Sequence, residues 1–190
     1  CVSVNNEVVH GIPSDKRYIK NGDIVSLDAG LIYKGYHSDA ARTHGIGEIS
    51  DEAQKLIDVT RQSFFEGIKN AKPGKHLVDI ARGIQTYAEN NHFSVVRDLV
   101  GHGIGTSLHE EPEIPNFVRL RRGAKLQKGM TLAVEPMINA GTYDVWWMDD
   151  DWTVVTRDGR LSAHYENTIA ITEDGCEILT MLPEEFAEVK

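Results

Sequence analysis

The distribution of apolar and polar positions along the chain predicts several short strands. Residues 24–32 are rich in apolar side chains and predict a strand, and residues 36–43 predict its hairpin partner. Other apolar segments of strand length lie at residues 1–4, 93–100, 130–134, 164–172 and 177–181.

Two longer segments have the apolar spacing of helices. Residues 51–70 follow Ser50, a suitable N-cap, and end before Pro73-Gly74. Residues 77–90 place apolar side chains on one stripe and predict a second helix. Because the strands outnumber the helices and come in hairpin-like clusters, the pattern favours an α+β fold over a doubly wound α/β fold.

Composition is that of an ordinary globular protein. The 190 residues predict one domain over 1–190, with 41% hydrophobic and 26% charged residues. A formal net charge of −9 argues against a nucleic-acid partner or an anionic membrane surface. Since the sequence holds no long uninterrupted apolar run, no membrane-spanning helix is predicted.

The cysteines and the start of the chain add two expectations. Cys1 and Cys176 are too few for a disulfide scaffold, which predicts a reducing compartment, the cytoplasm. Residues 1–4 resemble a strand already under way, and Cys1 is not an initiator methionine. We therefore expect the chain to begin inside a longer one.

Two aspartates lie in the strands of the predicted hairpin. A turn at Tyr33-Lys34 would place Asp28 and Asp39 directly opposite each other, and a turn at Lys34-Gly35 would place them diagonally. Both registers put the two carboxylates on one face, and only an odd-length turn would separate them. Facing like charges are destabilising, and a cation between them would reverse that effect. The alternative, two solvated acids on an exposed face, is disfavoured by the apolar flanks.

Two glutamates occupy equally apolar surroundings. Glu135 follows residues 130–134, and Glu166 lies inside residues 164–172. An ionised carboxylate is rarely buried unless it is paired or bound to a metal. One such acid is usually an ion-pair partner, but four acids without an equal number of basic residues in the strands suggest a metal site.

Three histidines could join these acids. His102 lies among three glycines in residues 101–105, a pattern that argues for backbone packed close to a ligand. His109 follows seven positions later, without the H-E-x-x-H spacing of zincins. Taken singly, a histidine near glycines is more often structural than a ligand, and His10 carries the weakest signal.

Four carboxylates and at least one imidazole form an oxygen-rich ligand set. Such a set suits Mn, Fe, Co or Zn better than copper, and its charge fits two divalent ions better than one. Paired metals serve hydrolysis because they polarise the scissile carbonyl and lower the pKa of water. One glutamate can carry a proton from water to the leaving amine, and a neutral histidine can donate a hydrogen bond to the substrate.

Motifs that span nearly the whole chain lead to the same conclusion. They lie at residues 4–13, 22–28, 35–39, 101–112, 133–137 and 151–168. In this order they resemble the type I methionine aminopeptidases, in particular those of Gram-positive bacteria. The resemblance implies the pita-bread fold, an antiparallel sheet with flanking helices, and removal of the initiator methionine from new polypeptides with a small second residue.

The resemblance also implies a metal centre and catalytic residues. Asp39 and Glu166 match ligands that bridge two divalent ions (Co, Mn, Fe or Zn), and Glu135 also matches the residue that handles the catalytic proton. His109 and His10 match histidines that contact the scissile peptide and stabilise the tetrahedral intermediate. The implied ligand set is Asp28, Asp39, His102, Glu135 and Glu166.

Further positions match the substrate pocket and a cation site. The pocket for the methionine side chain is implied by Trp152, Cys1 and Leu108. A monovalent cation site, bound mostly through backbone oxygens, is implied by Asn5, Glu7 and Ser162.

Departures from the family concern the pocket. Family members carry an N-terminal segment ahead of the position of Cys1, so we expect the substrate pocket to be incomplete in this chain. Leu108 replaces an aromatic residue common in relatives. This change should widen the methionine pocket and soften specificity by about 1 kcal/mol.

Other functions remain open at this point. An X-Pro aminopeptidase or dipeptidase on the same fold is the nearest alternative, although the residues after His109 and around Glu135 look more like those of the methionine enzymes. A non-catalytic binding protein on the same scaffold is disfavoured because all five ligands are present, and a purely structural acidic domain would require the motifs to arise by chance. We predict a monomer that acts on the N-terminal methionine of peptides and nascent proteins, with no nucleic-acid or membrane partner.

An acidic run near three tryptophans could suggest a second cation site. Residues 149–151 are all aspartate and lie beside Trp146, Trp147 and Trp152. We favour a solvated hairpin tip with Trp152 turned inward.

Overall fold

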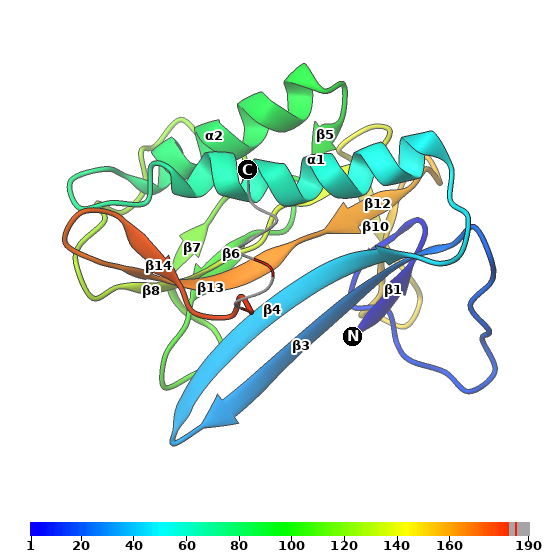
Figure 1. Cartoon of the computed structure of the whole chain (residues 1–190), viewed down its shortest axis with the longest axis horizontal. Coiled ribbons are helices and arrows are strands. Elements are labelled where there is room, and N and C mark those ends of the chain that lie inside the picture. Colours follow the sequence, from blue (N-terminus) through cyan, green and yellow to red (C-terminus); the bar gives the residue numbers. More distant parts are fainter. Residues whose placement is uncertain (183–184, 186–190) are drawn as a thin grey trace.

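A single antiparallel sheet forms the centre of the molecule (Figure 1). The structure, a computed structural model, describes residues 1–182 and 185. The sheet has eight strands in the order β1-β3-β4-β13-β8-β6-β7, with β14 paired to β13. These strands are β1 (Val2–Val4), β3 (Ile24–Tyr33), β4 (Tyr36–Gly45), β6 (Gly101–Gly103), β7 (Glu110–Ile114), β8 (Thr131–Val134), β13 (Glu166–Ile171) and β14 (Cys176–Ile178).

Two helices, α1 (Asp51–Ile68) and α2 (Leu77–Asn90), cover one face of this sheet (Figure 1). The main core lies between them and the central strands, and Phe64 and Ile84 are fully buried there against Leu132 and Ile169. Because side chains alternate along a strand, the neighbours of these residues face the other side of the sheet. That alternation directs Glu166 and Glu135 away from the helices.

The two helices approach closely where each carries a glycine. A Cβ on Gly83 would lie 2.5 Å from the carbonyl oxygen of Glu66, and a Cβ on Gly67 would lie 2.6 Å from Cγ1 of Ile84. The predicted N-cap is confirmed, since the backbone N–H of Ala53 donates to Oγ of Ser50 at 3.2 Å.

Two three-stranded sheets flank the main sheet. One has the order β10-β11-β2 and the other β12-β9-β5. The strands are β2 (Glu7–Val9), β5 (Ser94–Val95), β9 (Met137–Asn139), β10 (Val145–Trp147), β11 (Val154–Thr156) and β12 (Ser162–His164).

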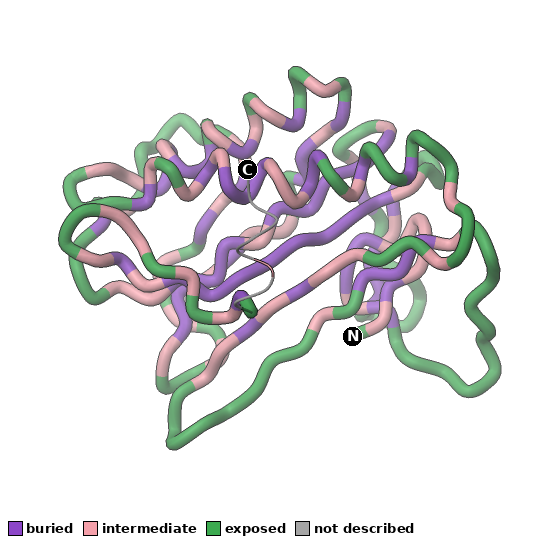
Figure 2. Tube along the Cα trace, in the orientation of Figure 1, coloured by how far each residue is buried: buried purple, intermediate pink, exposed green. Residues whose placement is uncertain are grey.

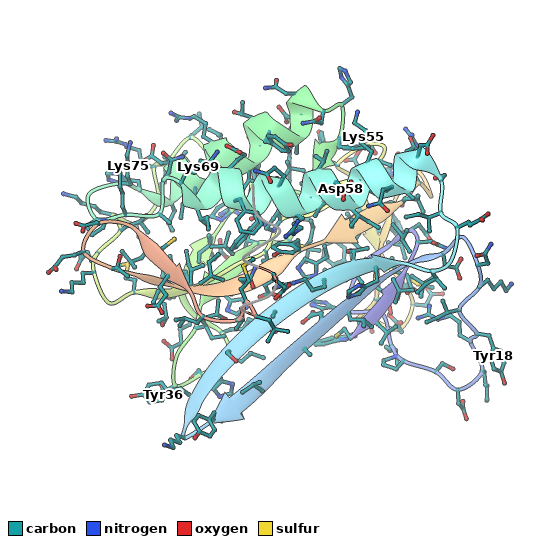
Figure 3. The ribbon with its side chains drawn as sticks, viewed as in Figure 1. Tyr18, Tyr36, Lys55, Asp58, Lys69 and Lys75 are labelled. Carbon is teal, nitrogen blue, oxygen red and sulfur yellow. The ribbon has the colours of Figure 1, made fainter. Side chains whose placement is uncertain are left out.

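The β3–β4 hairpin extends beyond the rest of the molecule, and its tip is exposed (Figure 2). Tyr36 projects from this tip, and Tyr18 projects from the loop that precedes β3 (Figure 3). The turn residues Lys34 and Gly35 have φ values of 49° and 84°, as a two-residue type I′ turn requires. Tyr33 pairs with Tyr36, so the register is the diagonal one of the two alternatives.

Two of the expected strands differ in extent from the sequence prediction. Over residues 93–100, only Ser94–Val95 is a strand, and the chain bends at residues 97–98, after the Val96 N–H has donated to the Met137 carbonyl at 3.0 Å. The expected strand at 164–172 is divided at Tyr165 into β12 and β13, which pair with different partners. The expected strand at 177–181 is Cys176–Ile178.

The α+β fold predicted from the sequence is confirmed. None of the helices in the described part of the chain has the length and apolar content that a membrane crossing requires.

Candidate metal centre

A small cavity of about 240 Å³ lies on the sheet face opposite the helices. Its acidic and imidazole lining comes from several strands and loops that are distant in sequence, which is why only the folded chain assembles it. All five of the expected metal ligands line this cavity, together with His10, His109 and Glu113.

The β3–β4 hairpin contributes Asp28 and Asp39. Asp39 pairs with Gly30, so the two aspartates are diagonal neighbours on one face. Thr168 fixes the backbone of Asp39, because its Oγ1 accepts from the Asp39 N–H at 2.9 Å and donates to the Asp39 carbonyl at 3.0 Å. Burial and the charge of Asp28 raise the pKa of Asp39 to about 6. The hairpin thus holds two neighbouring aspartates, and Asp39 loses its proton less readily than an ordinary aspartate.

Glu135 and Glu166 complete the acidic lining. Glu135 follows β8 and Glu166 begins β13, which is paired with β8. Burial raises the pKa of each well above its usual range, and nearby carboxylates reinforce the shift. Oε1 of Glu166 is buried without a hydrogen-bond partner in the described part of the chain. An unpaired buried carboxylate oxygen of this kind fits a metal ligand.

His102 is oriented by its own strand. Its Nδ1 lies 2.9 Å from the carbonyl oxygen of Gly103, and with Nδ1 as the donor, Nε2 is left with a free lone pair. Burial lowers the pKa of His102, which keeps the imidazole neutral as metal binding requires. Ligand atoms of Asp39, His102 and Glu166 all lie within 4.8 Å of one another.

His164 is a site residue that the sequence analysis missed. It is 2% exposed, and its Nε2 lies 3.9 Å from Oε2 of Glu135 and 3.9 Å from Oε2 of Glu166. Neither ring nitrogen has a hydrogen-bond partner among the described residues, and burial lowers its pKa to about 4. The available signal was its position two residues before Glu166, on the same face of a strand.

The expected catalytic histidines lie beside the acids. His109 meets His102 edge to face, with ring centroids 4.3 Å apart. His10 has a φ of 62°, and burial lowers its pKa. Both histidines line the cavity, so the structure brings them together with the acids.

The expected methionine-pocket residues lie around the cavity and not in its wall. The Cys1 amino group donates to the Asp28 carbonyl at 2.6 Å. The Leu108 side chain lies beside Gly30, where a Cβ would be 3.4 Å from its Cδ1. Trp152 is 53% exposed and stacks on His10. The prediction that Trp152 turns inward is therefore wrong in degree, because only the ring face toward His10 is covered.

Two of the residues expected to hold a monovalent cation are joined by a backbone hydrogen bond. The Ser162 N–H donates to the Asn5 carbonyl at 2.9 Å, which places these two backbones side by side. Glu7 follows Asn5 by two positions, and its side chain forms an ion pair with Arg17 at 2.5 Å.

Comparison with known proteins relates this geometry to a family. Residues 1–173 match the model of metallopeptidase family M24. A methionine aminopeptidase of Clostridium perfringens is 59% identical over 182 residues, which cover 96% of this chain and 73% of the relative. The crystal structure of the Thermotoga maritima methionine aminopeptidase superposes with a TM-score of 0.93 at 49% identity, covering 96% of this chain and 73% of that one.

The X-Pro enzymes are more distant. The X-Pro aminopeptidase of Thermotoga maritima has a TM-score of 0.73 and 26% identity, and the match covers 96% of this chain and 46% of that one. The chain therefore belongs to metallopeptidase family M24, and within it to the methionine aminopeptidases.

Proposed function

We propose that this chain removes the N-terminal methionine from polypeptides with a small second residue, by means of two divalent metal ions. The observation that carries the proposal is the gathering of Asp28, Asp39, His102, Glu135 and Glu166 around one cavity. Without a cation, these acids repel one another, and burial disfavours their charged forms. The raised pKa values of three of them are the expected signature of a cation site seen without its cation.

The donor set fits divalent ions. Carboxylate oxygens and a neutral imidazole suit Mn, Fe, Co or Zn. Glu166 belongs to both groups of candidate ligand atoms, one with Asp39 and His102 and one with Glu135 and His164, which supports a role for it as a shared ligand. Asp39 would be the second shared ligand, as the family resemblance implies. Divalent ions held there would polarise the scissile carbonyl and lower the pKa of water. Cobalt and manganese are the ions to try first.

Residues of the chain itself carry out proton transfer and bind the substrate. Glu135 accepts a proton from water and delivers it to the leaving amine. His109 and His10 donate hydrogen bonds to the peptide at the scissile bond, and the lowered pKa of His10 keeps that ring neutral. Cys1, Leu108 and the exposed face of Trp152 surround the methionine side chain.

Three further properties belong to the same proposal. The chain acts in the cytoplasm as a monomer, without nucleic-acid or membrane partners. A monovalent cation binds near Asn5, Glu7 and Ser162. The net charge of −9 is consistent with a substrate that presents a cationic α-amine.

A metal titration tests the function. The chain is stripped of metal by dialysis, Co²⁺ or Mn²⁺ is added stepwise, and release of the free N-terminal residue is measured with Met-Ala-Ser and with an X-Pro peptide. Release from Met-Ala-Ser alone, rising as one or two ions bind, supports the proposal. Hydrolysis of only the X-Pro peptide would replace it with the X-Pro activity, and binding of metal without turnover of either would indicate a non-catalytic protein.

A further inference from the structure

A cavity of about 830 Å³ lies outside the candidate metal centre. It forms where the loop of residues 115–124 crosses the first turns of α2, and its floor is apolar, with Leu77, Val78 and Ala81. Its volume is within the range of known ligand sites, roughly 300–1,000 Å³. We call it the loop pocket.

The loop is held in place by the helix that it crosses. The Val78 N–H donates to the Arg122 carbonyl at 3.1 Å, and the Leu77 N–H donates to the Ala124 carbonyl at 3.1 Å. The Val118 N–H donates to Oε1 of Gln85 at 2.8 Å. These bonds also satisfy amides of the first helical turn, so the loop and the helix fix each other. Hydrogen bonds between the loop and α2 thus fix the shape of the loop pocket.

Its rim combines apolar side chains with three arginines and two glutamates, Glu111 and Glu113, so that cationic side chains are in excess. Leu120 is fully exposed, at 108%, although the loop that carries it is anchored on both sides. Arg119, Arg121 and Arg122 lie within four positions, in a chain with a net charge of −9. Arg121 and Arg122 form no ion pair with any residue in the described ranges 1–182 and 185. Such a rim complements a segment with apolar and acidic side chains.

The loop pocket and the metal centre share a wall. Glu113, on β7, lines both cavities, and Arg119 pairs with it through Nη1 at 3.0 Å from Oε2. β7 is the last strand of the main sheet, so its outer edge has no neighbouring strand in the described part of the chain. A polypeptide whose first residue occupies the metal centre can therefore cross this edge and reach the loop pocket.

We propose that the loop pocket binds the polypeptide substrate beyond the scissile bond and favours downstream segments with apolar and acidic side chains. This inference rests on the proposed aminopeptidase function and adds a second region of substrate recognition to it. The metal centre selects the N-terminal residue, and the loop pocket selects among polypeptides that share that residue.

Paired peptides test the proposal. The acidic peptide is Met-Ala-Ser-Gly-Leu-Glu-Leu-Glu-Gly-Gly, and the basic peptide has Lys in place of Glu. Each kcat/KM is divided by that for Met-Ala-Ser on the same variant, so that any general change in activity cancels. We expect the native chain to favour the acidic peptide by about tenfold, with the preference falling as salt rises.

Substitutions locate the preference. The double variant Arg121→Glu, Arg122→Glu should reverse it, and Leu120→Ser should weaken the normalised kcat/KM of both longer peptides. Arg157→Glu reverses one charge at another exposed position and should leave the preference as it is, whereas either Arg121→Glu or Arg122→Glu alone should weaken it. An unchanged preference in the double variant overturns the inference, as does a change in oligomeric state by size exclusion without a change in preference, which would make the loop pocket a contact between copies. Failure of the proposed function is distinct, since Met-Ala-Ser itself would then release no methionine.

Discussion

The imidazole of His10 stacks on the indole of Trp152, with ring centroids 4.9 Å apart and planes inclined by 25°. The backbone supports this pair, since the carbonyl of His10 accepts a hydrogen bond from Oγ1 of Thr153 at 3.4 Å. His10 is thus held at the cavity wall by a residue that also offers its other face to the solvent. Under the proposed function, Trp152 would have two roles, one as a surface for the substrate and one as a support for the ring of His10.

Replacing Trp152 should therefore weaken catalysis without releasing metal. An aromatic contact of this kind contributes about 0.5–1.5 kcal/mol, so Trp152→Leu should lower kcat/KM for Met-Ala-Ser by up to about tenfold. Initial rates and a metal titration separate the two effects. The matched control is Trp147→Leu, at an exposed position of β10. It should change neither kcat/KM nor metal binding. Weakened metal binding in the Trp152 variant would contradict the assignment of Trp152 to the substrate side.

Removing Glu166 should remove metal as well as activity. Its carboxylate belongs to both groups of candidate ligand atoms, so Glu166→Ala should abolish turnover and lower the metal content below two ions per chain. Metal analysis after dialysis against a known Mn²⁺ concentration measures the content. Glu173→Ala, which removes an exposed acid paired with Lys128, should retain the metal. Two bound ions and normal activity in the Glu166 variant would refute the site.

Of the two adjacent histidines, His102 should act as a metal ligand and His109 as a substrate contact. We expect His109→Ala to keep its metal and lose most turnover, and His102→Ala to lose metal affinity. Their rings are in contact, so both substitutions remove the same ring contact and differ in the role that is lost. Isothermal titration with Co²⁺ and rates with Met-Ala-Ser test both. If the His109 variant loses metal instead, the two roles have been exchanged.

The metal-free chain should be stabilised when Asp39 is made neutral. The pKa of Asp39 is raised to about 6 in the fold, so its ionised form costs stability. That cost is absent below the unfolded pKa near 3.8 and is fully present above about pH 6. Asp39→Asn should therefore raise the free energy of unfolding at pH 8 by about 2 kcal/mol, since one pKa unit corresponds to about 1.4 kcal/mol and some solvent reaches the site.

The control for this measurement is the pH. At pH 3 the native aspartate is already protonated, so the two chains should have equal stability by urea unfolding. In the presence of Mn²⁺ at pH 8 the order should reverse, because the native chain gains the binding energy of the ion. A destabilised Asn variant without metal at pH 8 would contradict the account.

The sequence predicted the acidic residues of the site better than the turn and the neighbouring residues that surround them. The common face of Asp28 and Asp39 follows from an even-length turn, whereas the choice of register depends on positive φ angles at Lys34 and Gly35. The expected strand at 164–172 placed His164 on the same face as Glu166, a signal that the sequence analysis left unused. The break between β12 and β13 at Tyr165 was also missed, because a break between two strands with different partners leaves no mark in the apolar pattern.

The loop pocket was beyond the reach of sequence patterns. Its shape depends on the hydrogen bonds that hold residues 115–124 across α2, and none of these bonds follows from periodicity. The expected strand at 93–100 was too long for a related reason, because the chain bends at residues 97–98 and a bend inside an apolar stretch does not show in its periodicity.

The proposed ligands extend from position 28 to position 166, and this spacing has a kinetic consequence. Only the Asp28–Asp39 pair belongs to a local hairpin, while Glu166 reaches it through the distant pairing of β13 with β4. In the unfolded chain these groups are separated by long loops whose closure is entropically costly, so metal uptake follows long-range strand pairing. Interactions that form only after the folding transition state change the rate of unfolding and leave the rate of folding almost unchanged. Bound metal should accordingly lengthen the lifetime of the folded chain against unfolding and proteolysis while leaving the speed of folding nearly as it is.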